Sequence, residues 1–160
     1  MNERQQNALK TVKHYMWGSM GAGLIPGPLV DLIAVSGVQV KMLAEVSKIY
    51  EVPFQKNRGK AIVASLLGFS LAHSMACGVL GIFLKSIPIV GVLAGGPAMA
   101  VFSGASAWAV GSVFIRHFES GGTFLDFDPE KAKQYYRTQF EEGRRMATTM
   151  GTEVPAAVPV

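Results

Sequence analysis

His73 and Cys77 are two side chains in the apolar middle of the chain whose types could do chemistry. They stand four residues apart, so they share one face of a helix. An imidazole and a thiolate are zinc ligands, but a zinc site needs three or four protein ligands, and the sequence shows no further ligand cluster that would complete one. We therefore expect no metal, and we interpret His73 as a buried histidine that hydrogen-bonds across a helix pair.

Asp31 is another ionisable residue that stands in a mainly apolar region. It follows a stretch rich in glycine and proline, where a carboxylate favours the start of a helix. An ionisable side chain inside a membrane segment is, however, a functional candidate by default. His73 and Asp31 together therefore leave open a small channel or transporter subunit, in which both would act as intramembrane polar groups.

Enzymatic chemistry finds no support in the remaining motifs. A phosphate-binding loop ends in Gly-Lys-Ser or Gly-Lys-Thr after a buried strand, whereas Gly59 and Lys60 are followed by alanine and no strand precedes them. The acidic residues Asp126, Asp128 and Glu130 lack the twelve-residue loop of a calcium site and are better explained as a helix start. No nucleophile stands in a recognisable catalytic context. We expect neither catalysis nor a cofactor.

The longest apolar region determines the predicted fold. Residues 61–115 contain a single formal charge, Lys85, which lies beside Pro88. A bilayer-spanning helix needs about 20 consecutive apolar residues, and the stretches on either side of Lys85 are each long enough. Over the whole chain only 16% of residues are charged, against about 25% in a typical soluble domain. We expect an all-α, membrane-associated domain with a central apolar helical hairpin, or else a soluble helical core that buries the same residues.

Small residues recur every four positions along this apolar region. Such a pattern lets membrane helices approach each other backbone to backbone. We expect it to pack helices within the hairpin or to join subunits into a homo-oligomer. The positions concerned are Gly91, Gly95, Ala100, Gly104, Ala107 and Gly111.

Two proline-containing turns are expected to separate helices. Proline removes a backbone donor and disfavours helix at the preceding residue. Each turn follows one helical segment and precedes another, which favours two helix–proline turn–helix units. The turns consist of Ile25, Pro26 and Gly27, followed by Asp31, and of Ile87 and Pro88.

Further helices are predicted outside the hairpin. Apolar residues at three- and four-residue steps predict an amphipathic helix over residues 34–50. Asp128, followed by proline and glutamate, predicts a capped helix over residues 129–145. Beyond it the chain is small, polar and rich in proline and alanine, so residues 146–160 are expected to be a disordered tail. The sequence therefore predicts a single helical domain over residues 1–145.

The charge pattern bears on partners and orientation. The net charge is +4, but the basic residues are scattered and no nucleic-acid-binding motif is present, so we expect no nucleic acid partner. Lys56, Arg58 and Lys60 precede the first apolar segment, and Arg116 follows the second. Basic flanks are retained on the cytoplasmic side of bacterial membranes, which favours cytoplasmic termini. Trp17 and Trp108 are candidates for anchors at the membrane interface, although Trp108 lies far enough inside the apolar segment to face another helix instead.

Loose motifs from Ala8 to Arg145 resemble the bacterial domain-of-unknown-function family 697. Members of that family are often attached to Era-like GTPase domains or are encoded as short membrane-associated proteins. The resemblance implies a helical domain of the bacterial inner membrane that works with a GTPase in trans, and it implies no catalytic residue. The positions that carry it are Ile25-Pro26-Gly27, Asp31, Gln39, Met42-Leu43, Tyr50 and Val52-Pro53, then Ile87-Pro88, Gly111, Phe118 and Gly121.

These observations together favour a non-enzymatic, membrane-embedded helical scaffold or anchor that self-associates. Its amphipathic helix would lie near the cytoplasmic interface, and its capped C-terminal helix would offer a surface to a partner. A channel or transporter subunit and a soluble helical assembly are the alternatives.

Overall fold

A computed structural model describes the backbone of residues 1–22, 28–76 and 90–153. Within these ranges it does not describe the side chains of residues 22, 28–32, 74–76, 90–98 and 150–153. These parts form α-helices and contain no strand, which confirms the all-α prediction. The helices are α1 (Glu3–Ala22), α2 (Pro28–Ile49), α3 (Lys56–Ala76), α5 (Val90–Glu119) and α6 (Pro129–Glu153).

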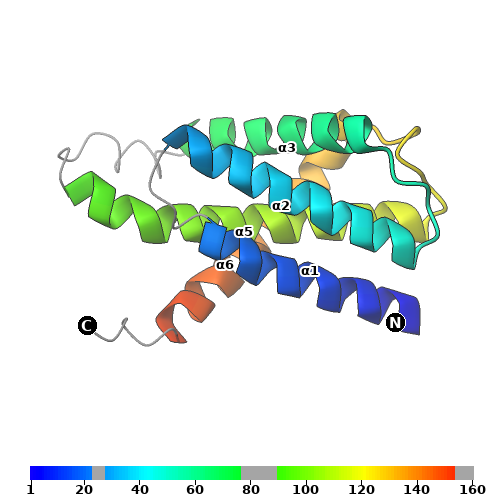
Figure 1. The fold of residues 1–160 in the computed structure, drawn as a ribbon, viewed down its shortest axis with the longest axis horizontal. Helices are drawn as coiled ribbons and strands as arrows, with labels where there is room; N and C mark the ends of the chain where they lie inside the picture. The colour runs from blue at the N-terminus through cyan, green and yellow to red at the C-terminus, as the bar shows by residue number, and fades with distance from the viewer. Residues whose placement is uncertain (23–27, 77–89, 154–160) are drawn as a thin grey trace.

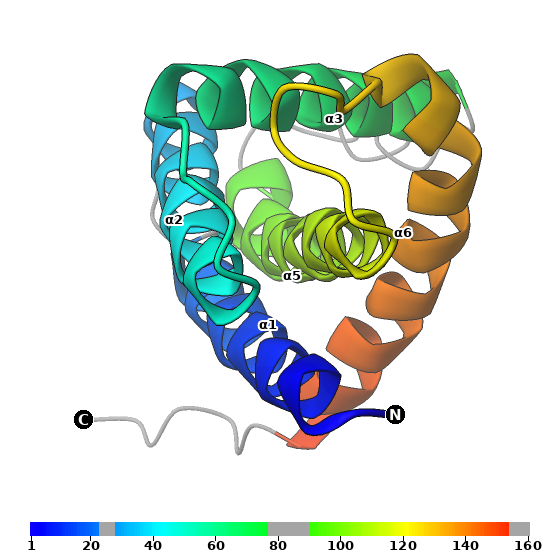
Figure 2. The ribbon, with the colours of Figure 1, turned by 90° about the vertical axis from the view of Figure 1, so that its right-hand side faces the viewer.

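Helix α5 lies at the centre of the bundle, with the other four helices around it (Figure 2). Every side chain from Phe102 to Ile115 is buried. The segment Met99–Glu119 is long and apolar enough to cross a membrane, yet 83% of its most apolar stretch is buried inside the bundle. Burial on all sides therefore accounts for the uniformly apolar sequence of this helix.

The helices alternate in direction along the bundle (Figure 1). Helices α1 and α3 run one way, α2 and α5 run the other, and α6 crosses them obliquely (Figure 2). As a result, the C-terminal ends of α1 and α3 and the N-terminal ends of α2 and α5 lie together at one end of the molecule. The chain's N-terminus and the segments that join α2 to α3 and α5 to α6 lie at the opposite end.

Both helices of the expected apolar hairpin are present, as α3 and α5. Helix α5, however, packs most extensively against α6 and α1 and least against α3, so the pair does not form a self-contained hairpin. Periodicity identifies which residues are apolar but cannot say which helix covers them, because α5 is apolar on every face. The segment with Lys85, Ile87 and Pro88, like that with Ile25, Pro26 and Gly27, lies outside the described residues.

The helix boundaries extend the sequence predictions in two places. Helix α2 begins at Pro28, earlier than the amphipathic stretch 34–50, and ends at Ile49. Helix α6 begins at the predicted cap, since the Glu130 amide donates a hydrogen bond to Asp128 Oδ1 at 3.0 Å. It continues past residue 145 to Glu153, so the predicted tail is wrong for residues 146–153, while 154–160 lie outside the described residues.

Tertiary packing explains why α6 is longer than its sequence predicts. The side chain of Ala147 is fully buried, and Met146 packs against the same hydrophobic core. The burial of these two residues extends the helix into a segment whose composition alone resembles a polar tail.

Candidate functional site

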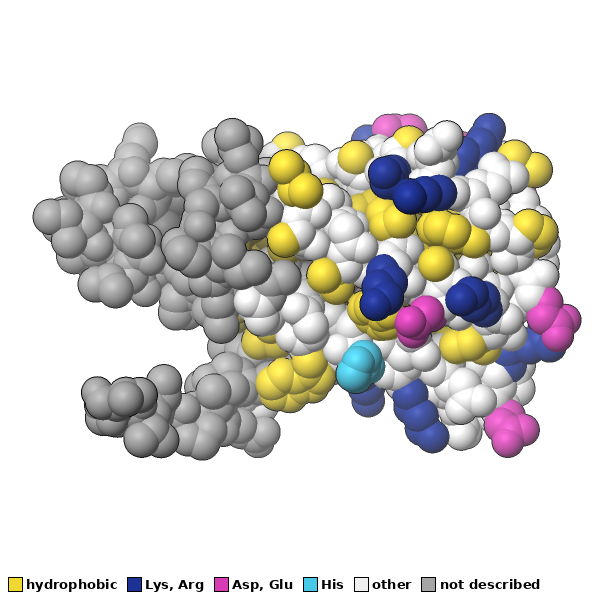
Figure 3. All heavy atoms as spheres, viewed as in Figure 1, with side chains coloured by type: hydrophobic (Ala, Val, Ile, Leu, Met, Phe, Trp, Pro, Cys, Tyr) yellow, Lys and Arg dark blue, Asp and Glu magenta, His cyan; other side chains and the backbone are white. Residues whose placement is uncertain are grey.

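Formal charges are distributed unevenly along the bundle. No Lys, Arg, Asp or Glu follows Lys13 in α1 or Lys60 in α3, and none precedes Arg116 in α5. In α2 only Asp31 precedes Lys41. Because the helices alternate in direction, their uncharged parts gather at one end, where the described surface in Figure 3 shows no charged side chain.

We call this region the charge-poor end and define it as residues 17–22, 28–40, 61–76 and 90–108. The opposite region is the charged end. At the charge-poor end Ile33 is 74% exposed and Trp17 is 46% exposed. A Cβ atom added at Gly37 or Gly68 would meet nothing within 4 Å, so these glycines also face open space. The described surface that α1, α2 and α3 expose at this end therefore consists of apolar and small residues. Helix α6 brings the exposed Arg144 and Arg145 beside it, because Gly143 and Ala147 pack on Ala105 and Gly104.

Tyrosine–carboxylate hydrogen bonds join helices at the charged end. The Tyr15 hydroxyl of α1 donates to Glu45 Oε1 of α2 at 2.6 Å, and the Tyr50 hydroxyl at the end of α2 donates to Glu119 Oε1 of α5 at 2.6 Å. Burial, and then the bond to Glu45, raises the pKa of the Tyr15 hydroxyl to about 12. Burial and the bond to Glu119 raise the pKa of Tyr50 in the same direction.

The segment between α5 and α6 is also fastened at the charged end. Arg58 Nη1 donates hydrogen bonds to the carbonyl oxygens of Phe124 at 3.2 Å and Leu125 at 2.8 Å. His117 Nε2 lies 2.9 Å from the carbonyl oxygen of Thr123. These bonds tie the start of α3 and the end of α5 to one connecting segment.

The small residues singled out in the sequence bring α5 close to α1. A Cβ atom at Gly111 would lie 2.4 Å from Val12 Cγ2, and one at Gly104 would lie 2.6 Å from Met20 Cγ. This face of α5 is therefore covered by another helix of the same chain. Ala100 and Ala107 are buried as well, whereas Gly91 and Gly95 belong to α5 in a part whose side-chain surroundings are not described.

Gly143 is a close-contact residue that the sequence reasoning missed. A Cβ atom there would lie 2.9 Å from Trp108 Cβ and 3.0 Å from Ala105 Cα, so α6 approaches α5 at this point as closely as α1 does elsewhere. A signal was present in the sequence. Gly143 falls at helical spacing between the apolar residues Phe140 and Ala147, which are both buried.

The predicted polar residues are on two neighbouring helices. His73 lies in the last turn of α3 and is half-buried, and its ring stacks on Phe69 with 6.3 Å between ring centroids. Asp31 lies near the start of α2, but its side chain is outside the described part, and so is Cys77. Among the residues that the structure describes, no group of three or more His, Cys, Asp or Glu is placed to hold a metal ion.

A polar pair is buried between α2 and α5. Gln39 Nε2 donates a hydrogen bond to Ser106 Oγ at 2.8 Å, and Ser106 Oγ donates to the carbonyl oxygen of Ser103 at 3.0 Å. In the described part of the chain Gln39 Oε1 and Ser103 Oγ are buried without a hydrogen-bond partner. Gln39 is thus fully buried in the core, where an amide is seldom found.

Comparisons with known proteins identify a family and a relative of the chain. Residues 1–145 match the family described as Domain of unknown function (DUF697). The chain is 32% identical over 146 residues to magnetosome membrane protein 22 of Magnetospirillum gryphiswaldense, an alignment that covers 91% of this chain and 75% of that protein. No solved structure gives a significant match. The chain therefore belongs to the DUF697 family, whose function is unknown.

Proposed function

We propose that this protein is a non-enzymatic, membrane-associated helical scaffold or anchor whose charge-poor end enters the bilayer. The observation that carries the proposal is the confinement of formal charges in α1, α2, α3 and α5 to one end, with Asp31 as the exception. Charged side chains are costly inside the hydrocarbon region, whereas exposed apolar residues such as Ile33 are favourable there. The relative from Magnetospirillum, a magnetosome membrane protein by name, supports the same role.

The charge-poor end is suited to entering the bilayer rather than crossing it. Helix α5, the longest apolar helix, is shielded by its neighbours. Lys41 ends the uncharged stretch 32–40 of α2, and Lys60 precedes that of α3, which is where basic residues meet lipid headgroups.

The orientation and partners follow from the charged end. Basic residues there favour the cytoplasmic side of a bacterial inner membrane, with the N-terminus on that side. Helix α6, which runs from the charged end toward the charge-poor end, exposes Arg137, Glu142 and Arg145, and this charged surface would receive a partner such as a GTPase. Self-association would use surface outside the α1–α5 contact, because Gly104 and Gly111 are already covered within the chain.

Membrane fractionation with a carbonate wash tests the proposal on the full chain. We expect the protein to stay in the membrane pellet and to run as a defined oligomer after extraction in mild detergent. Release into the wash as a soluble species would contradict membrane insertion. That outcome would favour a soluble helical assembly, the function that the burial of α5 inside the bundle also permits.

A further inference from the structure

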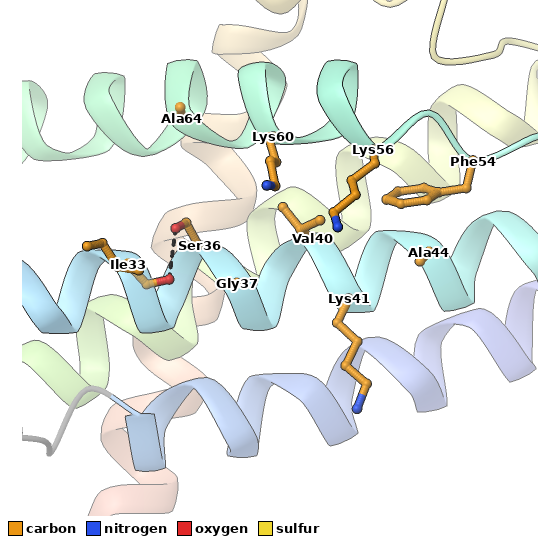
Figure 4. Close-up of a pocket in the computed structure, with 10 residues that line it drawn as sticks. All are labelled: Ile33, Ser36, Gly37, Val40, Lys41, Ala44, Phe54, Lys56, Lys60 and Ala64. Carbon is orange, nitrogen blue, oxygen red and sulfur yellow. Dashed lines mark hydrogen bonds between the residues drawn. The ribbon is translucent and has the colours of Figure 1, made fainter.

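A groove lies between α2 and α3 on the face shown in Figures 3 and 4. It is an open groove with a volume of about 650 Å³. Its walls are mainly apolar or small, and its charged residues are all lysines. It is lined by Ile33, Ser36, Gly37, Val40, Lys41, Ala44, Phe54, Lys56, Lys60 and Ala64.

The lysines give the groove an uncompensated positive charge. Lys56 and Lys60 point from α3 toward α2 across the groove, while Lys41 points from α2 toward α1 (Figure 4). All three are exposed, and none has an ion-pair partner among the described residues. No acidic residue is among the described residues that line the groove. An anion with an apolar portion therefore matches both the charge and the walls.

The groove runs from the charged end of the bundle to the charge-poor end. Its lysines and Phe54 lie toward the charged end, whereas Ile33 and Gly37 lie at the charge-poor end. A Cβ atom at Gly37 would meet nothing within 4 Å, so the floor is open at this level. A phospholipid whose chains enter the bilayer with the charge-poor end would have its phosphate at the level of the lysines.

We propose that the α2–α3 groove binds one anionic phospholipid, with its phosphate between Lys56 and Lys60 and an acyl chain over Gly37 toward Ile33. This inference rests on the proposed membrane association and deepens it, because it names the class of lipid that the protein selects. Ammonium groups bind phosphate as point charges, and the apolar walls would cover methylene groups that a free anion lacks.

The test compares lipid selection with membrane binding for the full chain. Bound lipid is counted by native mass spectrometry after extraction in the presence of phosphatidylglycerol, and membrane binding is measured by flotation with phosphatidylcholine vesicles. Gly37→Leu fills the groove and keeps every charge, whereas Lys56→Glu with Lys60→Glu reverses the charge at its rim. The matched control is Lys131→Glu, an exposed lysine at the start of α6.

We expect one phosphatidylglycerol per wild-type and Lys131→Glu chain, and at least a tenfold loss of bound lipid in the Gly37→Leu and the Lys56/Lys60 variants. All variants should still float with phosphatidylcholine vesicles, because membrane binding does not depend on the groove. Loss of bound phosphatidylglycerol therefore tests the groove, and loss of flotation tests the proposed membrane association. Unchanged phosphatidylglycerol in Gly37→Leu, whose folding is checked by circular dichroism, would overturn the groove site. Full displacement of the lipid by an equal concentration of inorganic phosphate would also overturn it, since the site would then bind only an anion.

Discussion

The two ends of the bundle are held together in different ways. At the charged end, side-chain hydrogen bonds join helices, such as those from Tyr15 to Glu45 and from Tyr50 to Glu119. At the charge-poor end the described contact between α1 and α5 is apolar, with Met20 packed over Gly104, and the hydrogen bond from Gln39 to Ser106 joins two uncharged side chains. Hydrogen bonds to charged groups are thus placed where water can solvate their partners, whereas α1, α2, α3 and α5 bring Asp31 as their single charged residue to the other end.

Adding a charge at the charge-poor end should weaken membrane binding, and this is the largest effect that we expect. Ile33→Asp places a carboxylate on the exposed surface of the charge-poor end, at a cost of up to about 3 kcal/mol in the hydrocarbon region. We expect about a ten- to hundred-fold weaker partition into phosphatidylcholine vesicles, measured by flotation.

Leu125→Asp is the matched control, because Leu125 is also an exposed apolar residue of the same size, at 60% exposure, but lies at the charged end. It should partition like the wild type. Equal losses in the two variants would show that the ends do not differ in their relation to the membrane.

The close contacts between α1 and α5 should differ in rigidity between the ends. Gly111→Ala pushes a methyl group against Val12, a β-branched side chain with little freedom, whereas Gly104→Ala meets the flexible side chain of Met20. Overpacking costs about 1–3 kcal/mol, and the alanine returns about 1 kcal/mol of helix propensity. We expect Gly111→Ala to lower the free energy of unfolding by up to about 2 kcal/mol and Gly104→Ala to lower it by less, as measured by denaturant titration in mild detergent.

The tyrosine bonds at the charged end should contribute a smaller amount. Tyr50→Phe removes the hydroxyl that donates to Glu119, and a single hydrogen bond of this kind contributes about 1 kcal/mol. Tyr135→Phe is the control, because its hydroxyl makes no hydrogen bond among the described residues. If the two variants unfold at the same temperature, the bond to Glu119 does not stabilise the charged end.

Alkaline pH should weaken the charged end gradually. The pKa of Tyr15 is raised from its ordinary value of 10.0 to about 12 in the fold, so the folded chain keeps a proton that the unfolded chain loses. The stabilisation is complete below pH 10 and is lost as the pH rises toward 12. Thermal unfolding followed across this range should show a smaller decline for Tyr15→Phe than for the wild type; identical declines would contradict the role of this hydroxyl.

Sequence reasoning recovered the helical class and the local signals of the fold. The Asp128 cap and Pro129 at the first position of α6 are fixed by local backbone chemistry, so the start of that helix was predictable. The end of α6 was not, because Ala147 is helical through its burial against other elements. Local preferences cannot carry such information.

The arrangement of helices and the candidate site were predictable only in part. The apolar residues of α5 indicated that this helix lies either inside a protein core or inside a membrane. Which of the two covers it depends on the packing of α1 and α6, which the sequence of α5 does not contain. Gly104 and Gly111 were recognised as packing positions, yet their partners Met20 and Val12 are distant in sequence. The α2–α3 groove was not foreseen, because its lysines and Gly37 come together only in the folded chain.

The most direct test of the account uses Trp17, which lies at the charge-poor end and is 46% exposed. The other tryptophan, Trp108, is 7% exposed and its indole nitrogen has no hydrogen-bond partner among the described residues, so Trp108→Phe leaves a single reporter. The fluorescence of this variant is measured in vesicles with brominated acyl chains. We predict a blue shift and strong quenching of Trp17, since it would lie at the lipid boundary. Unquenched emission at the wavelength seen in water would contradict entry of the charge-poor end into the membrane.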